Sequence, residues 1–451
     1  MPARATLFVV LAAGEGTRMK SDSPKVMHAV AGQPMLGCVL DAAQAANGKA
    51  DLAVVVGPAM EAVADYAVAR APGAQTFIQR ERRGTADAVR AAGEAVNGHD
   101  GDIVVLYGDT PLIRPGTLTA MIESLAQGAD VAVLGFEAAN PSGYGRLIRE
   151  GGRLVAIREE RDASEAERDI RLCNSGVMAF RSGVLPELLG RISTSNAKGE
   201  YYLTDAVEIA VGLGKTVGLV EGTEQEVLGV NDRAGLAEAE AAAQQRLRQA
   251  ALTGGATLIA PDTVFLSHDT KIGRDVTVEP HVFFGPGVTV ADGATIRAFS
   301  HIEGAMIAER ATIGPYARLR PGADIGATAR IGNFVEVKAA RVETGAKVNH
   351  LTYIGDARVG EGANVGAGTI TCNYDGVAKH FTDIGPGAFI GSNTALVAPV
   401  RVGEGAYVGT GTVLTKDVAP HALAIGRARQ VEKPGWVTNL KRKAEPKGEA
   451  G

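Results

Sequence analysis

A glycine-rich turn near the start of the chain carries side chains suited to holding phosphate groups. Residues 11–19 read LAAGEGTRM, and Pro24-Lys25 follows shortly after them. Such a turn exposes backbone N–H groups that can cradle phosphate oxygens, and Arg18 and Lys25 would add positive charge for a triphosphate. The run lacks the Gly-Lys-Ser/Thr of a Walker loop, and Met19 occupies the third glycine position of a dinucleotide-binding fingerprint. The alternative is an ordinary turn between a strand and a helix.

Polar residues also interrupt the apolar pattern of the C-terminal half. The chain reads HLTY at 350–353 and NYDG at 373–376. Histidine is the default residue where a reaction needs a base with a near-neutral pKa. Arg320 and Lys338 lie in the preceding repeats and suit recognition of a phosphate group. A lone histidine in a repeat is more often structural, so a catalytic role for His350 depends on these polar neighbours.

The two groups of residues lie in halves with different periodicity. Up to about residue 230, short apolar runs alternate with helical stretches such as 84–96, which predicts a mostly parallel α/β sheet with helices on both faces. The expected strands are Thr6–Leu11, 52–56, 103–107 and 131–136. The first run, preceded by Arg4, also has the shape of a short secretion signal, but the loop after it favours the strand.

A helix is expected to join the halves. Residues 232–252 are rich in Ala, Glu, Gln and Arg, which are strong helix formers. Asn231 or Asp232 can cap its start, and Gly254-Gly255 can stop it.

After this helix, aliphatic residues recur at every sixth position, with a few slips of one residue. The series is Ile272, Val278, Phe284, Val290, Ile296, Ile302, Ile307, Ile313, Leu319, Ile325, Ile331, Val337, Val342, Val348, Ile354, Val359, Val365, Ile384, Ile390, Leu396, Val402, Val408 and Leu414. Each hexad would give one face and one corner of a prism, and coils bury their cores only against neighbouring coils. The pattern therefore predicts a left-handed parallel β-helix of hexapeptide repeats. The interruption at 370–383 should be a loop that projects from the prism, where function is often found.

Composition limits the class of protein. A chain of 451 residues is too long for one ordinary core, so two or three domains are expected. The net charge of -5 gives no reason to expect a nucleic-acid surface. Three scattered cysteines fit neither a metal spacing nor a disulfide framework, as in the reducing cytoplasm. No apolar stretch approaches the ~20 residues that span a bilayer, so no membrane partner is expected.

The motifs of the N-terminal half resemble those of the sugar-nucleotide pyrophosphorylases. The matching residues in chain order are those of 11–19, Pro24-Lys25, Gln79, Gly84-Thr85, Tyr107-Gly108-Asp109, Gly143-Tyr144-Gly145-Arg146, Glu159, Asn174 and Asn231. With the hexad domain added, nearly the whole chain resembles the bacterial bifunctional N-acetylglucosamine-1-phosphate uridylyltransferase / glucosamine-1-phosphate N-acetyltransferase family. The resemblance implies a cytoplasmic homotrimer that acetylates glucosamine 1-phosphate with acetyl-CoA. It then implies transfer of uridylyl from UTP to N-acetylglucosamine 1-phosphate, with Mg2+ as cofactor and pyrophosphate as the leaving group.

The resemblance also assigns residues to the N-terminal site. The nucleotide and its phosphates would contact Leu11, Ala12, Ala13, Gly14, Lys25, Gln79, Gly84 and Thr85, with Tyr107 and Gly108 beside them. Gly145, Glu159 and Asn174 would contact the sugar, Asp109 and Asn231 would hold the magnesium ion, and Arg18 and Lys25 would assist catalysis. Magnesium prefers one or two carboxylate-type oxygens plus substrate phosphates, which suits a lone Asp at a strand end. The alternative for Asp109 is a capping or turn residue.

For the C-terminal site the resemblance implies that His350 is the general base. Glucosamine 1-phosphate would be held by Arg320, Lys338, Tyr353 and Asn364. The acetyl-CoA groove would be lined by Ala367, Asn373, Tyr374, Ser392, Thr410 and Arg427. Thr410 stands where the family pattern has Ala, which puts that contact in doubt.

Together these expectations divide the chain into four parts: a nucleotidyltransferase domain at 1–230, a linker helix at 231–252, an acetyltransferase β-helix at 253–430 and a tail at 431–451. The tail carries Trp436 and the basic cluster Lys441-Arg442-Lys443, and it can reach a neighbouring subunit. The alternative is a disordered tail, which is equally common for basic segments. Two rival interpretations stay open: a single-activity sugar-1-phosphate nucleotidyltransferase with a structural β-helix, and a non-catalytic subunit. The first has no need of the HLTY and NYDG residues, and the second predicts decayed motifs.

Overall fold

The computed structural model describes residues 5–48, 50–438 and 440. They form two compact units. One is the chain up to Ala250 together with Leu266–His268, and the other is Ala251–Phe265 together with the chain from Asp269 onward. The basic cluster at 441–443 lies outside the described residues.

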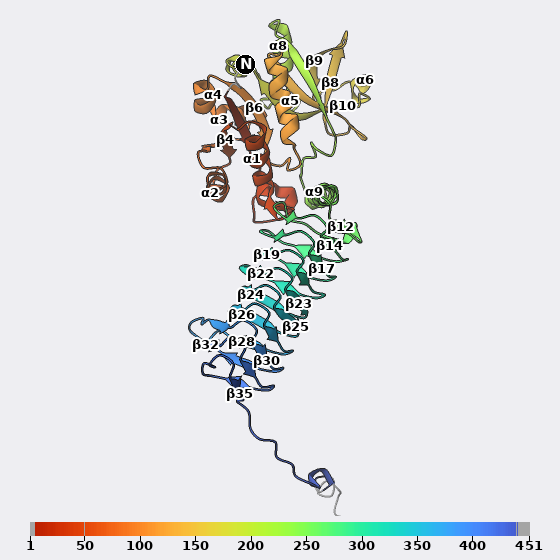
Figure 1. The fold of residues 1–451 in the computed structure, drawn as a ribbon. Coiled ribbons are helices and arrows are strands. Elements are labelled where there is room, and N and C mark those ends of the chain that lie inside the picture. Colours follow the sequence, from red (N-terminus) through yellow and green to blue (C-terminus); the bar gives the residue numbers. More distant parts are fainter. Residues whose placement is uncertain (1–4, 49, 439, 441–451) are drawn as a thin grey trace, which may run out of the picture. The chain divides into compact units, whose positions relative to one another are not determined.

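The first unit is a nine-stranded sheet with helices on both of its faces (Figure 1). The order of the main path is β11-β7-β10-β6-β1-β4-β5, and β8 and β9 extend from β10. The strands are β1 (Thr6–Leu11), β4 (Ala50–Val56), β5 (Gln75–Ile78), β6 (Asp102–Tyr107), β7 (Val131–Glu137), β8 (Gly145–Glu150), β9 (Arg153–Arg158), β10 (Leu172–Phe180) and β11 (Val217–Gly222), with a separate hairpin of β2 (Ala29–Val30) and β3 (Gln33–Pro34). β1 runs parallel to β4 and β6, whereas β10 runs antiparallel to β6 and β7. All four strands expected from the sequence are present.

Two cores lie on opposite faces of this sheet. The helices are α1 (Met35–Ala46), α2 (Glu61–Arg70), α3 (Thr85–Ala91), α4 (Gly93–Gly98), α5 (Pro115–Ala126), α6 (Glu165–Arg168), α7 (Val184–Leu189), α8 (Asp205–Gly212) and α9 (Arg233–Thr253). Because successive strand residues point to opposite faces, Phe8 and Val10 pack against α1, α2 and α5, and Leu7 and Val9 pack against α3, α4, α7 and α8. Burial on both faces explains why the first strand is apolar from Leu7 to Leu11.

Two stretches are expected from the sequence to be helical, 84–96 and 232–252. The helical stretch expected at 84–96 is present as α3 and α4, which are separated at Ala92, with φ -88° and ψ 21°, just before Gly93. The joining helix is present as α9, and the Asp232 carboxylate caps it by accepting the Gly235 N–H at 2.9 Å. Gly255 ends it with a φ of 97° and donates its N–H to the Leu252 carbonyl. None of the helices in the described ranges is both long and apolar enough to cross a membrane.

The second unit is a left-handed parallel β-helix with three strand ladders (Figure 1). The first ladder consists of β12 (Thr257–Leu258), β14 (Thr277–Val278), β17 (Thr295–Ile296), β20 (Thr312–Ile313), β23 (Arg330–Asn333), β25 (Lys347–His350), β27 (Asn364–Val365), β30 (Phe389–Ile390), β33 (Tyr407–Val408) and β35 (Leu423–Ala424). The second consists of β15 (Phe283–Phe284), β18 (His301–Ile302), β21 (Arg318–Leu319), the first half of β24 (Glu336–Val342), the first half of β26 (Tyr353–Val359), β28 (Ile370–Cys372), β31 (Ala395–Val397) and β34 (Val413–Leu414). The third consists of β13 (Lys271–Ile272), β16 (Thr289–Val290), β19 (Ala305–Ile307), β22 (Ala323–Ile325), the second halves of β24 and β26, β29 (Thr382–Ile384) and β32 (Val400–Val402).

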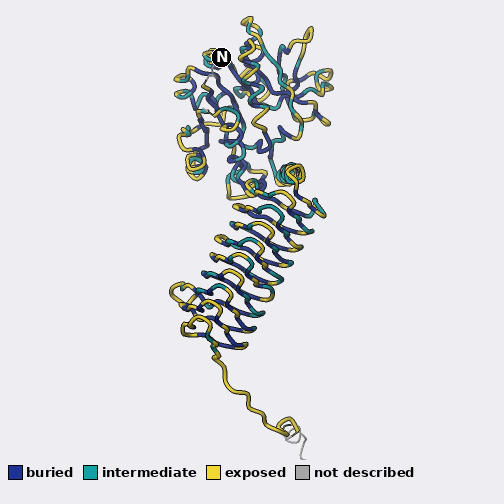
Figure 2. The backbone as a smooth tube through the Cα atoms, viewed as in Figure 1, coloured by how far each residue is buried: buried dark blue, intermediate teal, exposed yellow. Residues whose placement is uncertain are grey.

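The hexad residues form the interior of this prism. Every residue of the expected series from Val278 to Leu414 is buried, and Ile272 in the first coil is half-buried. Figure 2 shows the resulting alternation of buried and exposed positions along each coil.

The loop expected at 370–383 is shorter than the sequence indicated. Ile370–Cys372 and Thr382–Ile384 stay in the ladders, so only residues 373–381 leave the prism. Thr371 takes the inward position with 1% exposure, and its hydroxyl accepts the Gly355 N–H at 2.8 Å. A search for aliphatic residues overlooks a threonine whose hydroxyl finds a partner inside the prism.

Candidate active sites

A cavity of about 520 Å3 in the first unit lies where β1 and β6 end. Ligands of open α/β sheets bind outside the carboxyl ends of the strands. Most of the residues predicted for the N-terminal site line this cavity: Leu11, Ala12, Ala13, Gly14, Lys25, Gln79, Gly84, Thr85, Tyr107, Asp109, Gly145, Glu159 and Asn174. The structure therefore brings together residues that are up to 163 positions apart in the chain (Leu11 to Asn174).

The glycine-rich turn forms one wall of the cavity. A Cβ atom on Gly14 would meet nothing within 4 Å, so the backbone there faces open space. Gly16 has a φ of 65°, and the stem of Lys25 packs directly against it. The Arg82 Nε–H donates to the Ala13 carbonyl at 2.8 Å, and its Nη1 pairs with Glu15. The turn is thus held from both sides while its outer surface stays accessible to a phosphate.

Two cations and two side-chain oxygens meet next to this turn. The Lys25 ammonium contacts the Asp109 carboxylate and donates to the Asn231 Oδ1 atom at 3.3 Å. The Arg18 Nη2–H donates to the same Asn231 oxygen at 2.9 Å. Asp109 follows β6, and its carbonyl accepts the Val230 N–H, which brings the segment before α9 to the strand end. The Asp109 and Asn231 oxygens therefore already share one cation.

This arrangement fits a divalent metal ion in place of the ammonium. The described residues contain no group of three or more His, Cys, Asp or Glu that could hold a metal. Magnesium needs only one or two such oxygens when substrate phosphates complete its coordination. The residues present are compatible with such a shared site and not with an all-protein metal cage.

The side of the cavity that is predicted to bind the nucleotide is closed at Gly84 and Thr85 by contacts with other segments. The Gln79 Nε2 group donates to the Gly84 carbonyl at 3.3 Å and to the Asp87 carboxylate at 3.0 Å. Gly84 has a φ of 118°, and a Cβ atom there would lie 2.5 Å from the Tyr201 carbonyl oxygen. The Leu203 N–H donates to the Thr85 hydroxyl at 2.9 Å. The segment around Tyr201 therefore fixes the Gly84-Thr85 corner.

The opposite side of the cavity carries the three residues predicted to contact a sugar. Gly145 pairs with Asn174 across β8 and β10. The Thr204 hydroxyl donates to Glu159 Oε1 at 3.1 Å, and burial raises the pKa of that carboxyl. A Cβ atom on Gly145 would lie 3.6 Å from the same Glu159 oxygen, so the glycine leaves room beside the carboxylate.

Three predicted residues are not part of the lining. Arg18 and Asn231 approach it through their contacts with each other and with Lys25. Gly108 supports the floor: its N–H donates to the Leu11 carbonyl at 2.9 Å, and a Cβ atom there would lie 3.3 Å from the Ala12 side chain. Gly108 is thus a packing position in the structure.

In the β-helix, His350 is the last residue of β25, a strand of the first ladder. Asn333 occupies the same position one coil earlier, and its Oδ1 atom lies 2.7 Å from His350 Nδ1. Because an amide oxygen can only accept a hydrogen bond, Nδ1 carries the proton in this pair, and Nε2 is left with a free lone pair. The imidazole is exposed, so that lone pair is accessible to a substrate.

The cationic side chains predicted for the sugar phosphate lie on the second ladder. Arg320 Nη1 pairs with the Glu336 carboxylate at 2.9 Å, and Glu336 is the register neighbour of Tyr353. Lys338 has a neighbour that sequence analysis did not assign, Lys379 of the projecting loop. A hydrogen bond with Lys338 and the charge of that ammonium lower the pKa of Lys379. Two ammonium groups this close favour an anion between them.

The residues predicted for acetyl-CoA fall at two corners. Gly366, Gly391 and Gly409 stack in successive coils, which places Ala367, Ser392 and Thr410 in one column with His350. Arg427 lies one coil further on, where its Cδ atom would be 3.6 Å from a Cβ on Gly411. Asn373 and Tyr374 begin the loop at a different corner. There the Asn373 amide contacts the Asp356 carboxylate, and the Tyr374 hydroxyl donates to the Gly376 carbonyl at 2.6 Å.

These positions diverge around the prism. Asn364 and His350 are on the first ladder, His350 at the end of its strand, and Tyr353 is on the second ladder. The predicted set therefore extends over two faces of the prism.

Known proteins are similar to this chain over most of its length. Residues 8–172 match the MobA-like NTP transferase domain family. Over 441 residues the chain is 60% identical to the Bifunctional protein GlmU of Azorhizobium caulinodans, and 98% of each chain is covered. The chain belongs to the GlmU family. It is 59% identical over 449 residues to the GlmU of Xanthobacter autotrophicus, with 99% of this chain and 100% of the relative covered.

A further relative is the GlmU of Agrobacterium fabrum, which is 54% identical over 447 residues, with 99% of this chain and 98% of the relative covered. A solved structure of UDP-glucose pyrophosphorylase complexed with UDP-glucose aligns with 53% of this chain and 99% of its own at 20% identity and a TM-score of 0.44. The family expected from the sequence motifs is confirmed by the full-length GlmU relatives.

This GlmU-family chain has further cavity residues that sequence analysis did not assign. They are Arg82, Lys198, Glu200, Tyr202 and Thr204, among others. Four of them come from the segment 198–204, which reads KGEYYLT and lies between α7 and α8. The only sequence signal was a dense run of polar and aromatic residues in a connecting loop, where functional residues are common.

Proposed function

We propose that this chain first acetylates the amino group of glucosamine 1-phosphate with acetyl-CoA and then transfers uridylyl from UTP to the product, giving UDP-N-acetylglucosamine and pyrophosphate. The observation that carries the proposal is the presence of two separate sets of residues in one GlmU-family chain. One set lines the N-terminal cavity, and the other lies on the coils of the β-helix and includes His350 with its Asn333 partner.

In the N-terminal site the phosphate oxygen of N-acetylglucosamine 1-phosphate attacks the α-phosphorus of UTP, a new P–O bond forms, and the bond to pyrophosphate breaks. No protein nucleophile is needed, because positioning and neutralisation of charge supply the catalysis. The glycine-rich turn receives the triphosphate, and Arg18 and Lys25 lie beside it to offset its charge. Gly145, Glu159 and Asn174 orient the sugar on the opposite wall.

We assign Asp109 and Asn231 as the residues that would hold Mg2+. When bound, the ion supplies charge neutralisation for the triphosphate and the leaving pyrophosphate. With Asp109 engaged in holding the ion, the Lys25 ammonium would be available to a phosphate oxygen.

In the C-terminal site His350 Nε2 takes a proton from the amine of glucosamine 1-phosphate as the nitrogen attacks the thioester carbonyl. The C–N bond forms, the C–S bond breaks, and the CoA thiolate leaves and is protonated. Arg320, Lys338 and Lys379 supply the positive charge for the sugar phosphate. Tyr353 and Asn364 are the assigned sugar contacts, and the column from Ala367 to Thr410, together with Asn373, Tyr374 and Arg427, is the assigned acetyl-CoA groove.

The residues assigned to acetyl transfer extend over two faces of the prism. Asn364 and His350 lie on one face and Tyr353 on the next, which is an arrangement that a neighbouring copy can complete. We propose a trimer, since a three-sided prism can offer such contacts around a threefold axis. The cytoplasmic location expected from the cysteine content is part of the same proposal.

The test is an incubation with glucosamine 1-phosphate, acetyl-CoA, UTP and Mg2+, read by mass spectrometry, with each component omitted in turn. The full mixture should give UDP-N-acetylglucosamine, and omission of UTP should give N-acetylglucosamine 1-phosphate. H350A should lose acetyl transfer but keep uridylyl transfer to supplied N-acetylglucosamine 1-phosphate, and D109A should do the reverse. Pyrophosphate release without acetyl transfer would favour the single-activity alternative, in which the β-helix is a scaffold.

A further inference from the structure

Arg146 is a buried arginine at the edge of the sheet, 1% exposed, and one of the largest fully buried side chains in the described part of the chain. It occupies β8 and does not line the N-terminal cavity. A guanidinium is rarely buried unless its donors are used. The guanidinium donors of Arg146 therefore need acceptors inside the protein.

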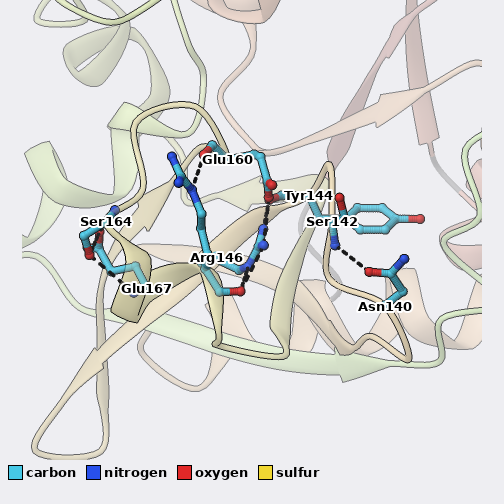
Figure 3. A network of polar contacts seen from close by, with 8 residues as sticks. Asn140, Ser142, Tyr144, Arg146, Glu160, Ser164 and Glu167 are labelled. Atoms are coloured by element: carbon cyan, nitrogen blue, oxygen red, sulfur yellow. Dashed lines mark hydrogen bonds and ion pairs between the residues drawn. The ribbon is translucent and has the colours of Figure 1, made fainter.

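Its donors reach three separate segments (Figure 3). Nη1 donates to the carbonyl of Tyr144, in the turn that leads into β8. Nε and Nη2 donate to the carbonyl of Arg168, at the end of α6, at 3.2 and 3.1 Å. Nη2 also pairs with the Glu160 carboxylate at 2.7 Å.

Glu160 and Arg168 lie at the two ends of a segment that contains α6 and has hydrogen bonds of its own. Ser164 caps α6 in a capping box with Glu167: the Ser164 N–H donates to the Glu167 carboxylate at 2.8 Å, and the Glu167 N–H donates to the Ser164 hydroxyl at 3.3 Å. The segment from Glu160 to Arg168, which forms an arch, is thus stabilised by its own capping box. Arg146 is the side chain that attaches both ends of this arch to β8.

Each predicted sugar contact is next in sequence to a member of this network. Gly145 directly precedes Arg146, and Glu159 directly precedes Glu160. Asn174 directly follows Cys173, the residue that pairs with Arg146 across β8 and β10. The Arg146 side chain thus links the turn before Gly145 to the segment after Glu159, and its backbone pairing with Cys173 places Asn174 beside Gly145. The side chain itself is not part of the cavity lining.

We infer that Arg146 is the positioning residue that assembles the sugar-phosphate half of the uridylyltransferase site by fixing the Tyr144 turn, Glu160 and the end of α6 to one another. The nucleotide half does not depend on it, because the Gly84-Thr85 corner is held by Tyr201 and Gln79 instead. The inference rests on the proposed function and predicts that Arg146 acts on one substrate and not on the other.

The experiment measures uridylyl transfer by R146M and R146K as a function of each substrate. In R146M the KM for N-acetylglucosamine 1-phosphate should rise by about tenfold or more, because an error of an ångström in a binding group has large effects. The KM for UTP should stay within about twofold. R146K keeps the charge but cannot reach three segments from one ammonium, so its change should be in the same direction and smaller.

Two controls separate positioning from general damage. R149M alters an exposed arginine of the same strand, whose Nη2 donates to the Gly152 carbonyl, and it should leave both KM values unchanged. Acetyl transfer, performed by the other unit of the same chain, should stay at the wild-type rate in every variant. Equal changes in the KM for both substrates, or no change in either, would overturn the inference.

If R146M does not fold, E160Q decides the question. It removes the ion pair and retains the shape of the side chain, and it should raise the sugar-phosphate KM without affecting that of UTP. An unchanged sugar-phosphate KM in both E160Q and R146K would overturn the inference. A wild-type chain that makes no UDP-sugar would overturn the proposed function itself, whereas an active wild type with unselective variants would overturn this inference alone.

Discussion

The Nδ1 atom of His350 lies 2.7 Å from the Oδ1 atom of Asn333, which occupies the same position one coil earlier. The backbone also restrains this position, since the Thr352 hydroxyl donates to the His350 carbonyl at 2.7 Å. An amide oxygen at Nδ1 selects the tautomer whose Nε2 is a base. The stacked coils thus orient the proposed base without any charged partner.

Removal of this amide should slow acetyl transfer. We expect N333A to lower kcat by about tenfold or more, since a misoriented base loses part of the ~10²- to 10⁴-fold that general base catalysis contributes. Uridylyl transfer should be unaffected. N333D is the informative partner, because a carboxylate beside the ring favours the imidazolium form. The acidic limb of its acetyl-transfer pH profile should therefore move to higher pH, and a profile identical to that of the wild type would contradict this role for Asn333.

Lys25 should compete with a divalent ion for Asp109. In K25M the Asp109 carboxylate loses the ammonium that it contacts, so the free chain should bind Mn2+ more tightly than the wild type does, because an opposing positive charge has been removed. Uridylyl transfer should nevertheless fall, since the same ammonium is proposed to serve the phosphates. Electron paramagnetic resonance titration with Mn2+ measures the first effect. K20M, which removes an exposed lysine nearby, is the matched control and should change neither property.

Two glycines of the N-terminal cavity should respond differently to the same substitution. G84A places a Cβ 2.5 Å from the Tyr201 carbonyl oxygen at a φ of 118°, so it should destabilise the first unit by ~1–3 kcal/mol. G14A meets nothing within 4 Å and should leave stability unchanged while it weakens UTP binding, because the methyl group projects where a phosphate would approach. Thermal unfolding with and without UTP measures both. If G84A is as stable as the wild type, the segment around Tyr201 can move away from the added methyl group, and the prediction is wrong.

The interior of the β-helix and the central strands were predictable because each depends on a local pattern. An inward residue of a coil must be small enough and apolar enough for a narrow prism, so Val278 and the residues after it repeat at a fixed interval. β1 is buried on both faces, which gives a continuous apolar run. Thr371 broke the first rule without breaking the ladder, because its hydroxyl is satisfied inside the prism.

Other parts of the sites left no such pattern. Tyr201 contacts the Gly84 corner, and Arg146 donates to the Arg168 carbonyl. Both contacts join segments that are distant in sequence, and no periodic pattern predicts them. Lys379 was overlooked because its relation to Lys338 depends on how the projecting loop folds back. Asn333 was in principle accessible, since the coil repeat places it one turn before His350.

Asp205, at the start of α8, should make stability depend on pH. Burial, followed by the charge of Glu208, raises the pKa of its carboxyl to about 6, against an ordinary value of 3.8. Between these two values the folded chain binds more protons than the unfolded chain, so the free energy of unfolding should fall as the pH rises from 4 to 6 and level off above that.

D205N removes this titration. Relative to the wild type, its free energy of unfolding should be higher by about 1–3 kcal/mol at pH 7.5, reduced by ~0.5 kcal/mol for the charge lost at a helix N-terminus. At pH 4 the two proteins should be equally stable. Urea unfolding of the first unit, followed by circular dichroism from pH 4 to 8, measures the difference. E208Q should give a smaller gain with the same pH dependence, because Glu208 is the second cause of the shift. A constant difference between D205N and wild type across this range would show that Asp205 does not titrate there.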